Sequence, residues 1–212
     1  MNIFLSILLS YIIGSIPFAL IIGKVFFKKD IRQFGSGNLG GSNTGRVLGK
    51  KFGLLVMILD QVKAIVAILL TKLIMGDASP NMVNLAIYLS GFFALIGHCY
   101  TCFANFKGGK AVASTFGILF ITNIYIYLIC LTLYGLLLKK FKLISLGSII
   151  IFFVAAALSI IPAFNKSPFL GVDFDLFYSL SLTIYACLVV YRHQSNIKRL
   201  RAGTESKITW MK

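Results

Sequence analysis

The sequence predicts an all-α, polytopic membrane protein with seven transmembrane helices, its N-terminus outside and its C-terminus in the cytoplasm. Three observations support this prediction: the composition, the spacing of the apolar runs and the distribution of basic residues. Of the 212 residues, 58% are hydrophobic and only 13% are charged, whereas a soluble domain has about 25% charged residues. Such a composition indicates membrane-spanning helices rather than a water-soluble core.

The apolar runs are long enough to cross a bilayer as helices. Pro17 in the first run should kink its helix, because proline has no N–H and its ring clashes with the preceding turn. A run over residues 111–138 fits either one long tilted helix or two short helices that turn near Thr122 and Asn123. The other five runs cover residues 3–27, 52–73, 83–103, 143–161 and 174–191.

The basic residues decide between these two topologies, because cytoplasmic loops carry an excess of Lys and Arg. Residues 28–51 and the tail 192–212 each carry six cations and one acid. The short segments 105–110 and 139–142 carry two and three lysines. All four segments lie on the cytoplasmic side only if residues 111–138 cross the membrane twice, as two helices. The chain then has seven transmembrane helices. A six-helix topology would place the three lysines on the wrong side.

The chain is expected to form a single membrane-embedded domain over residues 1–212, because no linker, low-complexity tract or internal repeat interrupts it. The first apolar run lacks a basic n-region and a cleavage site, so we expect a retained helix rather than a signal peptide. The net charge of +15 follows mainly from the basic cytoplasmic loops. The expected anionic partners are therefore membrane lipid and phosphate, with no nucleic acid.

A glycine-rich, cationic segment, GSGNLGGSNTGR (residues 35–46), separates the first two apolar runs. Its five glycines in twelve positions let the backbone bend and approach a ligand closely. Ser36, Asn38, Asn43 and Arg46 are among its hydrogen-bond donors, and it contains no acid. Exposed N–H groups, hydroxyls and a planar cation together suit a phosphate group.

Two further polar clusters follow at helix ends. The segment KGGK (residues 107–110) places two ammonium groups around a glycine pair just before a helix start, where anions are attracted. The alternative is a basic membrane anchor. The tail reads YRHQSNIKRLRAGTE. If the last helix continued into it, His193 and Asn196 would lie on the same helix face. The alternative for the tail is a basic patch that binds anionic lipid.

Three segments of the sequence together resemble the three motifs of the bacterial acyl-phosphate:glycerol-3-phosphate acyltransferases. These segments are GSGNLGGSNTGR, GH followed by FKGGKAVAS, and RHQSNIKRLRAGTE. The resemblance covers essentially the whole chain. It implies a multi-pass enzyme of the bacterial inner (plasma) membrane with its active site on the cytoplasmic face. Such an enzyme transfers an acyl group from acyl phosphate to the sn-1 hydroxyl of glycerol 3-phosphate. The products are lysophosphatidic acid and phosphate, in phospholipid biosynthesis.

The resemblance also implies roles for single residues and a partner, namely functional coupling to the enzyme that supplies acyl phosphate. The loop residues Ser36, Asn38, Gly40 and Asn43 would hold the acyl phosphate. The expected catalytic residues are Ser36, Lys107, His193 and Asn196. The expected substrate-binding residues are Asn38, Gly40, Asn43, Arg46, Gly108, Gly109, Lys110 and Ser145. The sequence departs from the family at Thr101, where proline is usual, and at Ala111, where glycine is usual.

The acidic residues are too few and too scattered for a metal site, so we expect no metal and no other cofactor. The absence of a DxxxD run argues against metal-dependent alcohol phosphatidyltransferases. No His-x4-Asp dyad occurs either, so His193 or a substrate phosphate would accept the proton. Asp60 and Lys63 are expected to pair on one helix face, and His98 is either a packing residue at a helix end or a base.

Two other functions fit the composition. An anion or phosphate-ester transporter would use similar cationic loops, but transporter sites lie near the bilayer midplane between inverted repeats. Here the polar clusters lie on one predicted face and no repeat is visible. A non-catalytic lipid-binding membrane protein is the third possibility.

Overall fold

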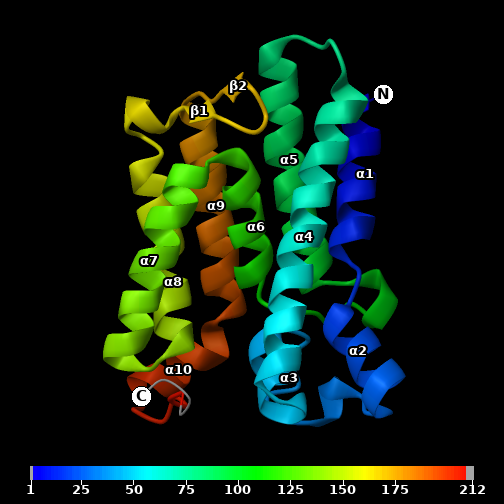
Figure 1. Ribbon diagram of the computed structural model, residues 1–212, viewed down its shortest axis with the longest axis vertical. Helices are drawn as coiled ribbons and strands as arrows, with labels where there is room; N and C mark the ends of the chain where they lie inside the picture. The colour runs from blue at the N-terminus through cyan, green and yellow to red at the C-terminus, as the bar shows by residue number, and fades with distance from the viewer. Residues whose placement is uncertain (1, 209–212) are drawn as a thin grey trace. The chain divides into compact units, whose positions relative to one another are not determined.

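The computed structural model describes residues 2–208, and nearly all of the elements in that part are helices (Figure 1). By length and composition, four helical stretches are able to cross a membrane, and three shorter apolar helices accompany them. The chain divides into two compact units, Met1–Ile118 and Leu119–Lys212. The predicted helical class is therefore confirmed, whereas the count of seven spans and the single domain stay predictions.

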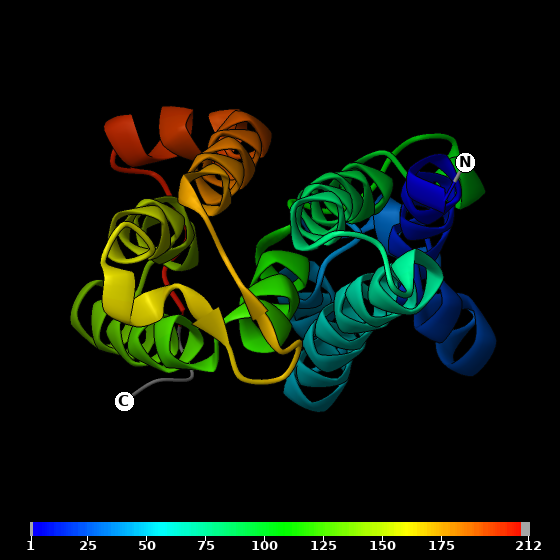
Figure 2. The same cartoon turned by 90° about the horizontal axis from the view of Figure 1, so that it is seen from above.

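In the first unit, α1 (Asn2–Gly14), α4 (Lys50–Met75) and α5 (Pro80–Cys99) pack against one another. Figure 2 shows these three helices end on, side by side. A Cβ added at Gly14 would collide with the backbone of Ala94, so α1 and α5 approach closely, as membrane helices with small interface residues do. The other elements of this unit are α2 (Phe18–Phe27), α3 (Gly41–Leu48) and 3₁₀ turns at Ile31–Gln33 and Cys102–Ala104.

The first apolar run is broken into two helices at Pro17, where a kink was predicted, and the break leaves two carbonyls without their helical partners. The Thr101 hydroxyl donates a hydrogen bond to Ser15 O. Lys63 Nζ donates to Ile16 O at 2.9 Å. Backbone carbonyls in an apolar interior need such partners, so these two side chains stabilise the broken helix. Thr101 thus has a structural use in the first unit.

In the second unit, α8 packs against both α7 and α9, which lie on either side of it (Figure 2). A short antiparallel hairpin, with Lys166 opposite Asp173, connects α8 to α9. The elements of the second unit are α7 (Ile124–Phe141), α8 (Ile144–Leu158), a 3₁₀ turn at Pro162–Phe164, β1 (Lys166–Ser167), β2 (Val172–Asp173), α9 (Leu176–Arg192) and α10 (Gln194–Arg201).

The predicted break near Thr122 and Asn123 is confirmed. α6 (Val112–Thr122) ends directly before Asn123, and α7 begins directly after it. Asn123 is buried, and its Oδ1 accepts a hydrogen bond from the Ile126 N–H at 2.9 Å. The two helices have 11 and 18 residues, and the Asn123 cap fixes where the second of them begins.

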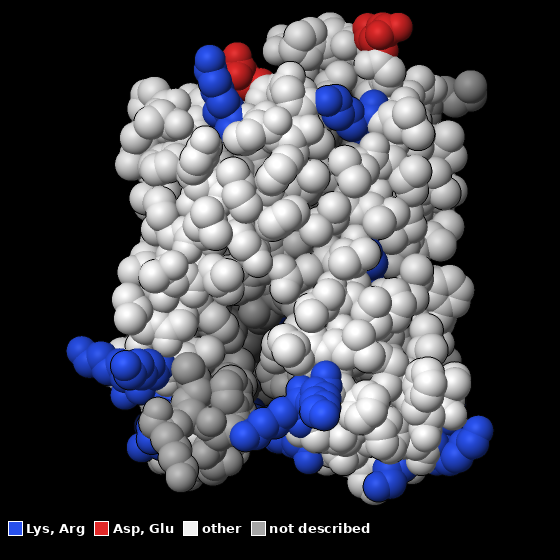
Figure 3. Space-filling model, viewed as in Figure 1, with Lys and Arg blue, Asp and Glu red and all other residues white. Residues whose placement is uncertain are grey.

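Most basic side chains on the face seen in Figure 3 gather at one end of the helices in each unit. This distribution agrees with the rule that the loops on one side of a membrane are basic. Which side that is stays a prediction.

Candidate active site

The glycine-rich segment begins as a loop whose shape depends on Asn43. This buried side chain accepts the Ser36 N–H at 2.8 Å through Oδ1 and donates to Phe34 O at 3.1 Å through Nδ2. Gly35 and Gly37 have φ values of 60° and 68°, which residues with a Cβ rarely adopt. A Cβ at Gly35 would also collide with the Asn43 amide. The amide of Asn43 is therefore used to hold the loop, while Ser36 is exposed.

The second half of the segment is a helix, and the expectation of a loop throughout was wrong there. Gly40 is the N-cap of α3, so Arg46 lies on a helix. The glycines let α3 pack closely on α4, because a Cβ at Gly53 would come within 2.7 Å of Gly45 Cα and 2.8 Å of Gly41 O. Two of the five glycines therefore serve helix packing.

Arg32 and Arg46 differ in their electrostatic surroundings. Arg32 donates from Nε to Asp30 Oδ1 at 3.0 Å and from Nη2 to Oδ2 at 2.6 Å. The hydrogen bonds from Arg32 lower the pKa of Asp30 to about 2. Asp30 is therefore ionised at neutral pH, and its negative charge offsets the positive charge of Arg32. Arg46 is exposed and makes no ion pair with the part of the chain that the structure describes. Arg46 is therefore the better placed of the two to bind an anion.

The glycine-rich loop and the KGGK segment lie against each other. Asn38 Nδ2 donates a hydrogen bond to Gly108 O at 3.2 Å across 70 residues of sequence. Gly108 and Gly109 are buried, Lys110 is half-buried and Lys107 is exposed. The first unit thus brings two of the predicted motifs together and leaves one cation of the second motif open to solvent.

Ala111, directly after KGGK, has a backbone conformation that favours glycine. Its φ is 63° and its side chain is buried, and the left-handed conformation costs an L-residue about 1 kcal/mol or more. We expect Ala111→Gly to raise the thermal unfolding midpoint of the purified protein, by a stabilisation of up to about 1 kcal/mol. Ala113→Gly within α6 is the control and should lower the midpoint. A lower midpoint for Ala111→Gly would contradict the expectation.

In the second unit, two predicted site residues meet at Glu205. Ser145 Oγ and Asn196 Nδ2 donate hydrogen bonds to Glu205 Oε1 at 2.8 and 2.6 Å. Arg199 Nε donates to Oε2 at 2.7 Å. Burial acts to raise the pKa of Glu205, but the three hydrogen bonds outweigh burial, and the pKa is lowered. The tail is thereby fastened to the start of α8.

Glu205 was not among the predicted site residues. The available signal was the occurrence of a single acid among the six cations of the tail. Its role depends on residues up to 60 positions away, which no local pattern reveals.

His193 lies at the corner between α9 and α10, so the tail does not simply continue the last helix. Its ring Nδ1 lies 2.7 Å from Val189 O. A carbonyl only accepts hydrogen bonds, so Nδ1 carries the proton of the neutral imidazole and Nε2 is its basic atom. His193 and Asn196 are both buried.

Replacing Glu205 by glutamine is expected to destabilise the protein by about 1–3 kcal/mol, because the three donors lose a charged acceptor. A lowered native pKa means that the stabilisation is complete above the ordinary glutamate pKa of about 4.3 and is lost as the pH falls through the lowered pKa. Thermal unfolding should therefore show a smaller difference between the two proteins at pH 4 than at pH 7. A difference independent of pH would contradict this account.

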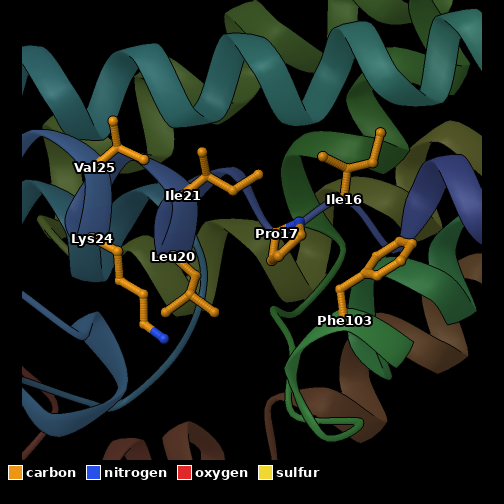
Figure 4. A pocket seen from close by; sticks show the side chains of 7 residues that line it. All are labelled: Ile16, Pro17, Leu20, Ile21, Lys24, Val25 and Phe103. Atoms are coloured by element: carbon orange, nitrogen blue, oxygen red, sulfur yellow. The ribbon is translucent and has the colours of Figure 1, made fainter.

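An apolar groove of about 460 Å³ lies at the break between α1 and α2. Figure 4 shows Phe103 and Ile16 toward one end and Lys24 toward the other. Lys24, whose Nζ lies 3.9 Å from the Asp30 carboxylate, is the one charged residue that the described part of the chain contributes to an otherwise apolar lining, so the groove suits hydrocarbon rather than phosphate. The residues that line it are Ile16, Pro17, Leu20, Ile21, Lys24, Val25 and Phe103.

Over residues 2–208, no three His, Cys, Asp or Glu side chains gather in a group that could hold a metal ion. Cys99 and Cys102 are free thiols, the first buried and the second exposed. That the reaction needs no metal or cofactor stays a prediction.

Residues 4–203 match the family described as glycerol-3-phosphate acyltransferase. Two relatives of that name come from Listeria monocytogenes serovar 1/2a and Staphylococcus aureus strain Newman. The Listeria protein is 41% identical over 210 residues, which cover 99% of this chain and 98% of the relative. The Staphylococcus protein is 40% identical over 215 residues, which cover 100% of both chains.

The fold is similar to two crystal structures of PlsY (YgiH), an integral membrane glycerol 3-phosphate acyltransferase. The glycerol 3-phosphate form superposes with a TM-score of 0.85 and the lysophosphatidic acid form with 0.83. In both cases the sequence identity is 28%, and the match covers 99% of this chain and 96% of the other. The family profile, the full-length relatives and the shared fold confirm the resemblance of the three motifs. This chain belongs to the family of integral membrane glycerol-3-phosphate acyltransferases.

Proposed function

We propose that this acyltransferase uses acyl phosphate as donor and the sn-1 hydroxyl of glycerol 3-phosphate as acceptor. The main support is the hydrogen bond from Asn38 to Gly108, which joins two glycine-rich, cationic motifs. Each motif contributes an exposed cation, Arg46 or Lys107, as the binding of phosphorylated substrates requires. The PlsY forms with glycerol 3-phosphate and with lysophosphatidic acid support the acceptor and the product.

Acyl phosphate is an activated donor, because phosphate is a good leaving group. The acceptor hydroxyl oxygen attacks the carbonyl carbon and forms the ester bond. The bond from that carbon to the phosphate oxygen breaks, and its electron pair leaves with phosphate. The hydroxyl proton passes to His193 or to a substrate phosphate. The enzyme has to bind two anions together, orient the hydroxyl and stabilise the developing oxyanion.

The proposed residue roles follow the three motifs. Ser36, Asn38 and Gly40 bind the acyl phosphate, and Asn43 shapes their loop through its hydrogen bonds. The residues proposed to bind glycerol 3-phosphate are Arg46, Lys107, Ser145, His193 and Asn196, with Gly108, Gly109 and Lys110 completing the second motif. Ser36, Lys107, His193 and Asn196 are the proposed catalytic residues.

The test of this proposal uses purified protein, palmitoyl phosphate and radiolabelled glycerol 3-phosphate. Labelled lysophosphatidic acid and one phosphate per product are expected. Palmitoyl thioester in place of palmitoyl phosphate is the matched control. Product formed only from the thioester would contradict the proposed donor. Uptake of labelled glycerol 3-phosphate by proteoliposomes without any lipid product would instead support a transporter.

We further propose seven spans in the bacterial inner membrane, with the N-terminus outside, the active site on the cytoplasmic face and functional coupling to the enzyme that supplies acyl phosphate. In a chain without native cysteines, Lys140→Cys is expected to resist a membrane-impermeant maleimide applied to intact cells, because its basic segment faces the cytoplasm. Asp77→Cys, in a connection proposed to lie outside, is the control and should react. Ready labelling at position 140 would overturn the seven-helix topology.

A further inference from the structure

A buried ionic cluster lies in the first unit, outside the residues assigned to the substrates. Asp60 and Lys63 on α4 pair at 2.8 Å, as predicted, and Asp60 Oδ1 lies 3.5 Å from His98 Nδ1 on α5. The exposed fractions of the three residues are only 2%, 4% and 5%. Charges so deeply buried are costly even when they are paired, and in membrane proteins they often mark functional positions.

The cluster reaches the KGGK segment through His98. His98 O accepts the Gly109 N–H at 2.9 Å. A Cβ added at Gly109 would come within 2.7 Å of His98 Cε1 and 2.9 Å of Cδ2. The Gly109 backbone therefore lies directly on the imidazole edge, and the Asp60 carboxylate faces the same ring at Nδ1.

We propose that His98 is a positioning residue for substrate binding: Asp60 orients its imidazole, and the imidazole fixes the backbone at Gly108 and Gly109. This inference rests on the proposed role of the KGGK segment in binding glycerol 3-phosphate. The Asp60 carboxylate near Nδ1 favours one orientation of the ring, and the ring in that orientation limits the conformations open to the segment. Binding groups that are held in place in advance bind an anion with less loss of entropy.

A double-mutant cycle between Gly109 and His98 tests the proposal. Gly109→Ala is expected to raise the KM for glycerol 3-phosphate about tenfold or more, with kcat within about threefold, because the displaced backbone weakens anion contacts. His98→Ala removes the ring that the new methyl group meets. In the His98→Ala background, Gly109→Ala is therefore expected to raise KM by no more than about threefold. Equal fold-changes in both backgrounds would overturn the proposal.

Gly135→Ala is the matched control, because a Cβ at that position meets nothing within 4 Å, and its KM should equal that of the wild type. If Gly109→Ala alone does not fold, recovery of folded protein in the double variant supports the same steric coupling. Failure of the double variant as well as the single one to fold would count against it.

The contribution of Asp60 is tested by Asp60→Asn combined with Lys63→Met, which removes both charges together. The KM for glycerol 3-phosphate should rise about fivefold or more as the imidazole loses its orienting carboxylate. An unchanged KM would remove Asp60 from the proposal. All these experiments measure the KM for the acceptor, glycerol 3-phosphate, so their outcomes do not depend on which acyl donor is used. Whether acyl phosphate is the donor is tested separately, by the comparison of palmitoyl phosphate with palmitoyl thioester.

Discussion

Lys107→Met is expected to lower kcat/KM for glycerol 3-phosphate about ten- to a hundredfold, because a charge-assisted contact to phosphate contributes about 1.5–3 kcal/mol. Lys107 leads into the glycine pair, and Gly108 is fixed to Asn38 by a hydrogen bond. Its ammonium group therefore extends from a backbone that other parts of the first unit hold in place. Methionine keeps an unbranched side chain of nearly the same length and removes its charge.

Lys142→Met is the matched control, with an expected change of about threefold or less, since isolated surface charges contribute about 0–1 kcal/mol. Lys142 is exposed, caps α7 with a φ of 59°, and its carbonyl accepts the Ile208 N–H at 2.8 Å. Methionine retains that backbone contact, and Lys139 and Lys140 keep the segment basic. Initial rates at equal amounts of folded protein measure the difference. Two equally active variants would make KGGK a membrane anchor.

Arg46→Ala is expected to raise the KM for glycerol 3-phosphate about ten- to a hundredfold, with a smaller effect on kcat, because a guanidinium binds phosphate through two hydrogen bonds. Arg46 lies within α3, where alanine is a good helix former. The fold should therefore survive the substitution. The neighbouring Arg32 cannot replace it, because Asp30 already binds that guanidinium.

Two comparisons separate this effect from a loss of surface charge. Lys51→Ala removes an exposed cation from the start of α4 and should leave KM within about twofold. Ser36→Ala should lower kcat instead, because Ser36 is proposed to contact the acyl phosphate near the reacting carbon. If folded Arg46→Ala kept the wild-type KM, Arg46 would not bind glycerol 3-phosphate.

Several local features could be predicted from the sequence because neighbouring residues decide them. Proline kinks or breaks a helix when it lies in the interior, so the interruption at Pro17 could be predicted from one residue. Asn123 interrupts an apolar run and caps the next helix through a residue three positions later. Asp60 and Lys63 pair because a helix places residues three apart side by side. The three motifs sufficed to identify the family.

Other features depend on residues that are distant in the sequence. The use of glycines in packing α3 on α4 follows from Gly53, which lies outside the motif. Glu205 acquires its role from Ser145, 60 positions earlier. From the sequence His98 was either a packing residue at a helix end or a base, and only the fold placed Asp60 near one side of its ring and Gly109 against another.

The sequence by itself determined the helical class, the breaks at Pro17 and Asn123, and the family, because hydrophobic periodicity, helix breakers and short motifs act over a few residues. Only the tertiary structure decided which side chains shape the site and which face solvent. The Asn43 amide is taken up by its own loop, Arg32 is neutralised, and Arg46 and Lys107 remain exposed. Hydrogen bonds and ion pairs act only over a few ångströms, so their partners are known only once the chain has folded.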